Sequence, residues 1–133
     1  LSDRHFEVRL IAAEFLGRCP DPQIAQALLP LTRDTDIDVR RAAVKSLGAI
    51  GGPEAIETLV IALTDEERMV RIAAEASLKQ IEPAWAQTTQ AQHAKARLEA
   101  SLDKCSPWVR SAVQQVLTRL AEAIGRPPSQ VVP

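Results

Sequence analysis

Residues 34–48 read DTDIDVRRAAVKSLG, and the main features of this stretch recur along the 133-residue chain. Val-Arg pairs stand at residues 8–9, 39–40, 70–71 and 109–110, which are 31, 31 and 39 residues apart. Eight residues after each Val comes a leucine: Leu16, Leu47, Leu78 and Leu117. Self-similarity at such a period indicates units that cannot bury their apolar faces alone and therefore stack on one another. The sequence thus predicts a repeat array.

Apolar residues within each unit recur at helical spacing. In the second unit they are Val39, Ala43, Leu47 and Ile50, and the third unit has apolar residues at the same offsets. Steps of four, four and three residues trace one stripe along a helix. A break follows each stripe, so that a second, shorter helix has room to run back along the first. Each unit is therefore predicted to be a helical hairpin.

Prolines and glycines mark the expected helix boundaries. Pro22, Pro53 and Pro83 follow the breaks and are placed to open the second helices, because the first helical position does not need the missing N–H. Gly17 and Gly48 come near the ends of first helices, where a residue able to take positive φ ends a helix at little cost.

These features resemble the HEAT repeat, and within it the short subtype named after phycobilisome lyases, whose pattern is an Asp, a gap, Val-Arg, paired Ala and Leu-Gly. Residues 34–48 match this pattern almost throughout. The resemblance covers residues 1 to about 82 well. It covers residues 94–124 more loosely, since Val113 replaces Ala and Thr118 replaces Gly. It implies an all-α fold, an α-α superhelix of helical hairpins with about seven helices.

The spacing of the pairs also predicts the domain organisation. Residues 1–126 are expected to form one repeat domain, with units at about 1–31, 32–63, 64–102 and 103–126, followed by a disordered tail at 127–133. Leu1 aligns with the last residue of a second helix, which suggests a piece of a longer solenoid. The 39-residue interval places an eight-residue insertion between Glu82 and His93, as a long loop or as an N-terminal extension of the next helix.

The amino-acid composition argues against several classes of function. The chain is 46% hydrophobic and 25% charged, which is ordinary for a globular domain, and its net charge is −1. Residues 1–66 carry seven Lys/Arg against eleven Asp/Glu, and residues 67–133 carry nine against six. This mixed charge argues against a nucleic-acid binder. No apolar run is long enough to span a membrane, and the two cysteines, Cys19 and Cys105, fit reduced thiols in a cytoplasmic protein.

Residues with the potential for chemistry show no catalytic or cofactor pattern. His5 and His93 are the two histidines, and Arg4-His5-Phe6-Glu7 lacks the convergent ligands that a metal site needs. No glycine-rich phosphate loop is present, and no Ser, Cys or His stands in a recognisable nucleophilic context. We therefore expect no metal, no cofactor and no catalytic residue, although an enzymatic role stays open.

Aspartates and arginines recur together in all four units. The HEAT resemblance implies that they form a structural ladder between adjacent hairpins, and a planar guanidinium beside a carboxylate would fix the register of the units. The alternative is a row of arginines that binds anions. The residues of the predicted ladder are Asp3, Arg9, Asp34, Arg40, Asp65, Arg71, Asp103 and Arg110.

The second helices supply the candidate protein-binding surface, because they line the inner, concave side in proteins of this resemblance. Two tryptophans outside the repeat pattern are added to it as possible binding anchors, although we favour their packing against each other. The full set is Gln23, Gln26, Glu54, Glu57, Thr58, Lys95, Arg97, Trp85 and Trp108.

The sequence thus predicts a non-catalytic scaffold for protein–protein interaction, whose partner is another protein or an adjacent domain of the same parent protein. A bilin-lyase-like or phycobilisome-processing protein is the first alternative, carried only by the resemblance in repeat subtype. A nucleic-acid-binding HEAT-like domain is the second, and it would require a basic stripe that the mixed charge of the second helices does not provide.

Overall fold

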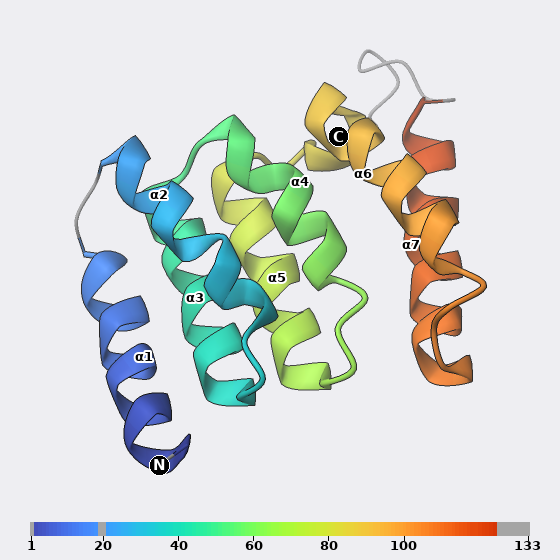
Figure 1. Ribbon diagram of the computed structural model, residues 1–133. Helices are drawn as coiled ribbons and strands as arrows, with labels where there is room; N and C mark the ends of the chain where they lie inside the picture. The colour runs from blue at the N-terminus through green and yellow to red at the C-terminus, as the bar shows by residue number, and fades with distance from the viewer. Residues whose placement is uncertain (1, 19–20, 125–133) are drawn as a thin grey trace.

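The computed structural model describes residues 2–18 and 21–124, and only the backbone of residues 2–6 and 22 (Figure 1). This part contains seven α-helices, two short 3-10 helices and no strand, so the predicted all-α fold is confirmed. The elements are α1 (Ser2–Leu16), α2 (Pro22–Leu28), η1 (Pro30–Arg33), α3 (Ile37–Ile50), α4 (Pro53–Ala62), α5 (Arg68–Ile81), η2 (Trp85–Gln87), α6 (Thr89–Ser101) and α7 (Pro107–Ile124).

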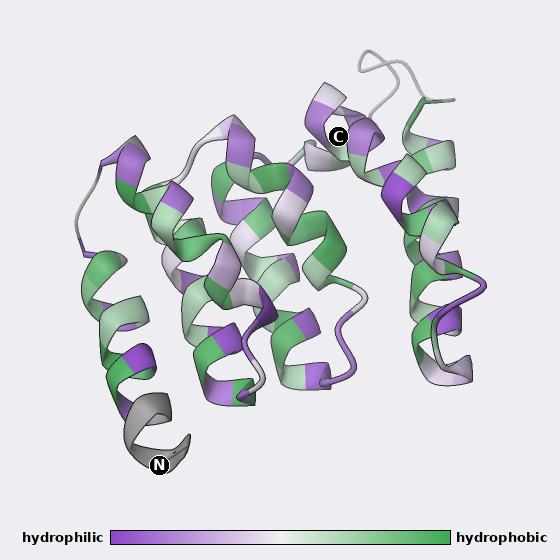
Figure 2. Ribbon diagram, viewed as in Figure 1, coloured by the Kyte–Doolittle hydropathy of each residue, from purple (hydrophilic) through white to green (hydrophobic). Residues whose placement is uncertain are grey.

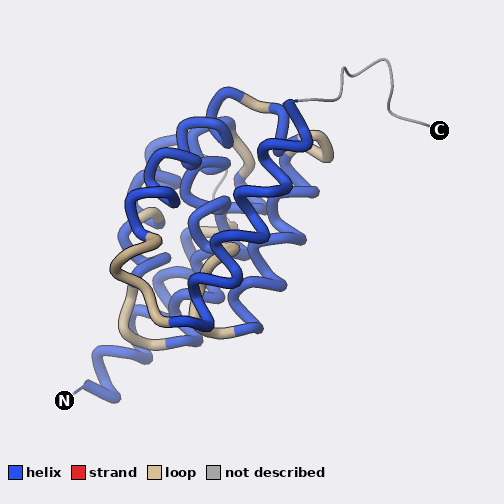
Figure 3. The backbone as a smooth tube through the Cα atoms, turned by 90° about the vertical axis from the view of Figure 1, so that its right-hand side faces the viewer, coloured by secondary structure: helices blue, strands red, loops and turns tan. Residues whose placement is uncertain are grey.

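The helices form two layers. The first helices α1, α3 and α5 lie side by side in one layer, and the second helices α2, α4 and α6 lie in the other (Figure 1). The edge-on view in Figure 3 shows the two layers with the loops gathered at their ends. The loops from α2 to α3 and from α4 to α5 are hydrophilic (Figure 2), as expected for connections that stay in contact with water.

The core follows the stripe that the sequence predicts. Val39 of α3 and Val70 of α5 are both 0% exposed, so the two residues occupy equivalent environments. Leu47 and Leu78, eight residues further on, are also fully buried. In the second and third units the repeat spacing therefore corresponds to a repeated packing position, as stacked hairpins require, whereas Val8 at the end of the stack is 65% exposed.

Side chains before several helices cap their free N–H groups. Asp36 Oδ1 accepts hydrogen bonds from the backbone N–H groups of Asp38 (2.9 Å) and Val39 (3.2 Å) at the start of α3. Pro22 and Pro53 stand at the starts of α2 and α4, as predicted.

The prediction for Pro83 is wrong. α6 begins at Thr89, where the extended Thr88 caps it by accepting a hydrogen bond from the N–H of Ala91 (3.2 Å). The insertion combines both expected forms, since it contains the short helix η2 and then leads directly into α6.

α1 ends at Leu16, directly before Gly17 as predicted, but the positive φ expected at Gly17 and Gly48 is wrong. Positive φ occurs at Gly51 (71°) and Gly52 (138°), not at these two glycines. A Cβ on Gly48 would lie 2.5 Å from Ser77 Oγ, and one on Gly17 would collide with Ser46 in the same way. The glycines are therefore needed for close approach of neighbouring first helices.

Hydrogen bonds complete this close contact. Ser46 Oγ donates to the carbonyl of Ala13 (2.7 Å), and Ser77 Oγ donates to the carbonyl of Val44 (2.9 Å). Each serine therefore joins its own first helix to the preceding one, and α1, α3 and α5 stack with the same geometry.

The last helix departs from this stack. Lys79 occupies the glycine position of the third unit, and Val116 occupies the serine position of the fourth. α7 packs mainly on α6 and on η2, which also contacts α5. Trp85 of η2 is 2% exposed, and the guanidinium of Arg119 lies 4.9 Å from its ring centroid. The insertion thus supplies the packing between the third unit and α7.

None of the described helices is both long and apolar enough to cross a membrane. The expected tail at 127–133, Cys19 and the side chains of Asp3 and His5 lie outside the described residues.

Candidate functional site

Arginines link adjacent units through carboxylates. Arg9 Nε lies 2.6 Å from Asp34 Oδ2, and its Nη2 lies 3.1 Å from Oδ1 of the same residue. Arg40 binds Asp65 in the same bidentate way: its Nε lies 3.0 Å from Oδ2 and its Nη2 lies 3.3 Å from Oδ1. Both pairs run from one unit to the next, which makes them ties between units.

The electrostatics of Asp34 fit a structural role. Burial raises the pKa of this carboxyl, but the hydrogen bonds from the Arg9 side chain and from the backbone N–H of Asp36 outweigh burial, so that its pKa lies below the ordinary value of 3.8. Arg40 Nη1 also donates to the carbonyl of Asp34 at 2.8 Å. Asp34 is therefore charged at neutral pH, with its partners within the fold.

This series of pairs stops at Arg71. Its Nη1 donates to the carbonyl oxygens of Asp65 (2.6 Å) and Glu66 (3.1 Å), yet no carboxylate among the described residues pairs with it. Asp34 and Asp65 stand five residues before the Val of their units, and in the fourth unit that position is Lys104. Asp103 and Arg110, which the sequence added to the ladder, are both exposed, and no ion pair joins them.

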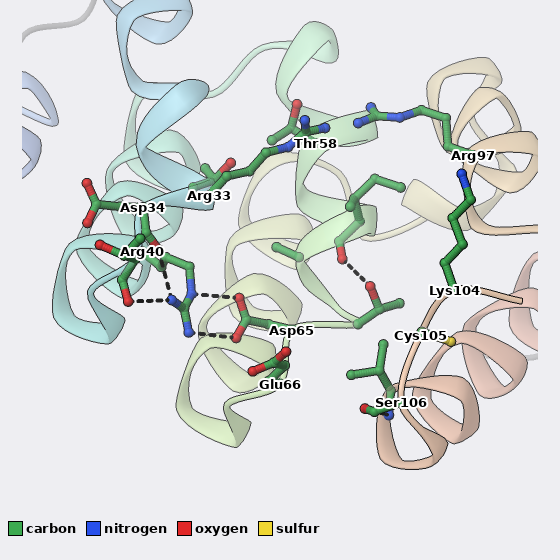
Figure 4. A pocket seen from close by; sticks show the side chains of 16 residues that line it. Arg33, Asp34, Arg40, Thr58, Asp65, Glu66, Arg97, Lys104, Cys105 and Ser106 are labelled. Atoms are coloured by element: carbon green, nitrogen blue, oxygen red, sulfur yellow. Dashed lines mark hydrogen bonds and ion pairs between the residues drawn. The ribbon is translucent and has the colours of Figure 1, made fainter. Parts of the chain in front are cut away.

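A groove of about 490 Å³ opens on the second-helix side, between η1, α4, α6 and the loop from α6 to α7. Figure 4 shows Arg33, Thr58, Arg97 and Lys104 reaching into it from these different elements. Thr58 and Arg97 belong to the surface predicted from the sequence. Arg97 also reaches Glu57 of α4, at 3.7 Å.

Arg33 and Lys104 line this groove but were missed by the sequence analysis. Both are exposed, and no carboxylate among the described residues pairs with either. Aligning the units on their Val residues would have indicated Lys104, because a positive charge there replaces the aspartate of the two preceding units. Nothing in the local sequence marks Arg33, whose position in the groove depends on the packing of η1.

The other predicted surface residues are scattered. Gln26 and Glu54 line a small cavity of about 70 Å³ between α2 and α4, Gln23 is exposed, and Lys95 is half-buried. The two tryptophans do not pack against each other, because Trp108 is 83% exposed whereas Trp85 is buried below Arg119. Trp85 is therefore removed from the candidate surface, and the burial of its large ring between helices is the reason.

The chemistry available in the groove is recognition through charge and hydrogen bonds. No group of His, Cys, Asp and Glu in the described part of the chain is placed to hold a metal ion. Cys105 at the groove is a free thiol that donates to the carbonyl of Leu102 (3.4 Å). The remaining lining residues offer guanidinium, ammonium and hydroxyl donors to a partner, together with the acceptor oxygens of the exposed Glu66.

Comparison with known proteins agrees with the stacked hairpins. The profile for HEAT repeats matches residues 1–79 of this chain. The chain belongs to the HEAT repeat family. HEAT repeats generally form scaffolds for protein–protein interaction. Among curated proteins, none matches the chain significantly. The HEAT match ends at Lys79, the residue that replaces the packing glycine of the first two units.

Proposed function

We propose that this HEAT repeat protein is a non-catalytic scaffold, which binds another protein or an adjacent domain through its second-helix face. The observation that carries the proposal is the groove of Figure 4, where Arg33, Arg97 and Lys104 come from three separate elements. Long-range packing holds these elements in place, so the backbone positions from which the three cations extend are fixed relative to one another.

The groove favours a polar, charge-guided contact. Arg40 in its wall is already paired with Asp65, and Asp34 is paired with Arg9. Apart from the exposed carboxylate of Glu66, the lining side chains without a close ionic partner are the cations Arg33, Arg97 and Lys104. Their excess would attract acidic side chains and raise the rate of encounter. Recognition by exposed charge and hydroxyl groups suits a scaffold, because it needs no chemistry from the chain itself.

Site-specific photocrosslinking tests the proposal. A photoreactive amino acid at Thr58, in the groove, should capture the same protein repeatedly from an extract of the source organism. The same amino acid at Gln114, an exposed residue of α7 that does not line the groove, is the matched control. Capture should be lost when Arg33 and Arg97 are both changed to Glu. Equal capture from the two positions, or capture that survives the charge changes, would contradict the proposal.

A further inference from the structure

A second groove separates α5 from α7 in the layer of the first helices, and it shares no lining residue with the groove of Figure 4. It has a volume of about 560 Å³ and an apolar floor that includes Ile72, Ala76, Ala112 and Val116. It exists because the glycine–serine contact that joins α3 to α5 is replaced by Lys79 and Val116. α7 is consequently held mainly by α6 and η2, and it reaches α5 across the groove through the ion pair of Arg119 with Glu75.

The rim of this groove is positive. Arg68, Arg71, Lys79 and Arg119 line it, with Glu75 as the single carboxylate. Arg119 engages Glu75 through two hydrogen bonds of 2.7 and 2.9 Å, and Lys79 Nζ lies 3.9 Å from the same carboxylate. Arg68 and Arg71 are therefore left without a carboxylate partner among the described residues.

Arg71 indicates what the groove binds. Its counterparts Arg9 and Arg40 each hold a carboxylate of the next unit through Nε and Nη2. The Nη1 of Arg71 donates to the same two kinds of backbone carbonyl as the Nη1 of Arg40, so its guanidinium is anchored in the same way. The Nε and Nη2 of Arg71, which would hold the carboxylate, have no carboxylate partner in the described structure. The reason is that Lys104 stands at the position where the two preceding units have an aspartate.

We propose that the α5–α7 groove binds an amphipathic helical segment of another protein. Apolar side chains of that segment lie on Ile72 and Val116, and one of its carboxylates takes the place at Arg71 that Asp34 and Asp65 take at Arg9 and Arg40. The inference rests on the proposed scaffold function and adds to it a second surface of stated chemistry. A groove between two helices with an apolar floor is a recurrent docking place for such helices.

The test uses a synthetic helical peptide with a leucine stripe flanked by glutamates. The control peptide carries lysines in place of the glutamates. Binding of both fluorescently labelled peptides to the whole chain is followed by fluorescence anisotropy. The glutamate peptide should bind, and the lysine peptide should not, because the rim repels it.

Two pairs of variants locate the binding. Ile72→Glu should abolish binding, whereas Met69→Glu is the matched control on the same helix, since the two residues are 51% and 50% exposed and Met69 does not line the groove. Arg71→Gln should weaken binding about tenfold, equivalent to about 1.4 kcal/mol. Arg33→Gln, in the other groove, should leave it unchanged.

The proposal is overturned if the glutamate peptide does not bind, if the lysine peptide binds equally well, or if Ile72→Glu and Met69→Glu behave alike. Occupation of the groove by a second copy of the chain would also overturn it, and sedimentation at increasing concentration would reveal that association through its loss in Ile72→Glu. Crosslinking at Thr58 reports on the opposite layer, so a failure of the scaffold function and a failure of this groove are distinguishable.

Discussion

The contact between α3 and α5 and the gap between α5 and α7 show how few residues decide whether two repeats close onto each other. At the contact between α3 and α5, Gly48 leaves room for Ser77 to approach, and Arg40 forms a bidentate ion pair with Asp65. At the gap between α5 and α7, the three corresponding changes are to Lys79, Val116 and Lys104. Each removes a close contact or an ion pair, and together they leave a groove where the preceding units have an interface. Binding surface thus arises where the repeat pattern is broken.

The largest expected effect comes from breaking the tight contact. Gly48→Lys places at α3 the residue that α5 carries naturally. It should lower the free energy of unfolding by about 3 kcal/mol, because the new side chain collides with Ser77 and forces α5 away. Urea denaturation measures the change. Lys79→Ala is the control, since this exposed side chain faces the open groove and its removal should change stability by less than about 0.5 kcal/mol. Equal losses of stability in Gly48→Lys and Lys79→Ala would mean that the α3–α5 contact is no more tightly packed than the α5–α7 gap.

The ion pairs should give the next largest difference. Arg40→Gln removes a largely buried bidentate pair with Asp65 and should cost about 2 kcal/mol of stability. Arg71→Gln loses only hydrogen bonds to backbone carbonyls, so its cost should be about 1 kcal/mol or less. Thermal or urea unfolding of both variants checks the order. A larger loss at Arg71 would show that it has a structural carboxylate partner after all.

Acid should weaken the link between the first two units and the link across the α5–α7 gap through different carboxylates. Although burial raises it, the pKa of Asp34 is lowered on balance by the hydrogen bonds from Arg9 and Asp36, and that of Glu75 is lowered chiefly by its hydrogen bonds with Arg119. A lowered pKa in the folded state means that ionisation stabilises the fold above the ordinary values, 3.8 and 4.5, and that this contribution is lost as the pH falls through the folded-state pKa.

Unfolding free energies measured from neutral pH down into this acid range test the assignment. Arg9→Gln should remove the part of the pH dependence that belongs to Asp34, and Arg119→Gln should remove the part that belongs to Glu75. A pH dependence that is unchanged in both variants would assign the acid sensitivity to other carboxyl groups.

The smallest expected effect on stability concerns Arg119, on the α7 side of the gap between α5 and α7. Arg119→Gln removes the guanidinium from above Trp85 and breaks the pair with Glu75, both of them partly exposed interactions. The loss should be about 0.5–1 kcal/mol. The emission of Trp85 should change with it, and a Trp108→Phe background isolates that signal. An unchanged spectrum would mean that the cation does not contact the ring in solution.

The repeated parts of the fold follow from the sequence because each unit repeats the same local rules. The stripe from Val39 to Ile50 predicts an amphipathic helix, and the recurrence at Val70 predicts that neighbouring units stack alike. The boundaries at Pro22 and Pro53 also follow, since proline at a first helical position is a local preference.

The errors have tertiary causes. The local sequence at Gly48 predicts a helix end, but the role of this glycine depends on Ser77 of the next unit, which only the packed structure brings close. The sequence around Trp85 predicts a surface residue or a partner of Trp108, but the structure buries this ring below Arg119 of α7. Asp103 was assigned to the ladder from its spacing to Arg110 alone, although Lys104 occupies the aligned position.

Sequence alone determined that this chain forms helical hairpins and that they stack, because both depend on apolar spacing within a unit and on its recurrence. Only the tertiary structure decided where the stack opens and which side chains meet in each groove. Those properties depend on contacts between residues tens of positions apart, such as Ser77 with Val44 or Arg119 with Glu75. Such contacts depend on the shapes of two helices at once, and no single segment of the chain encodes them.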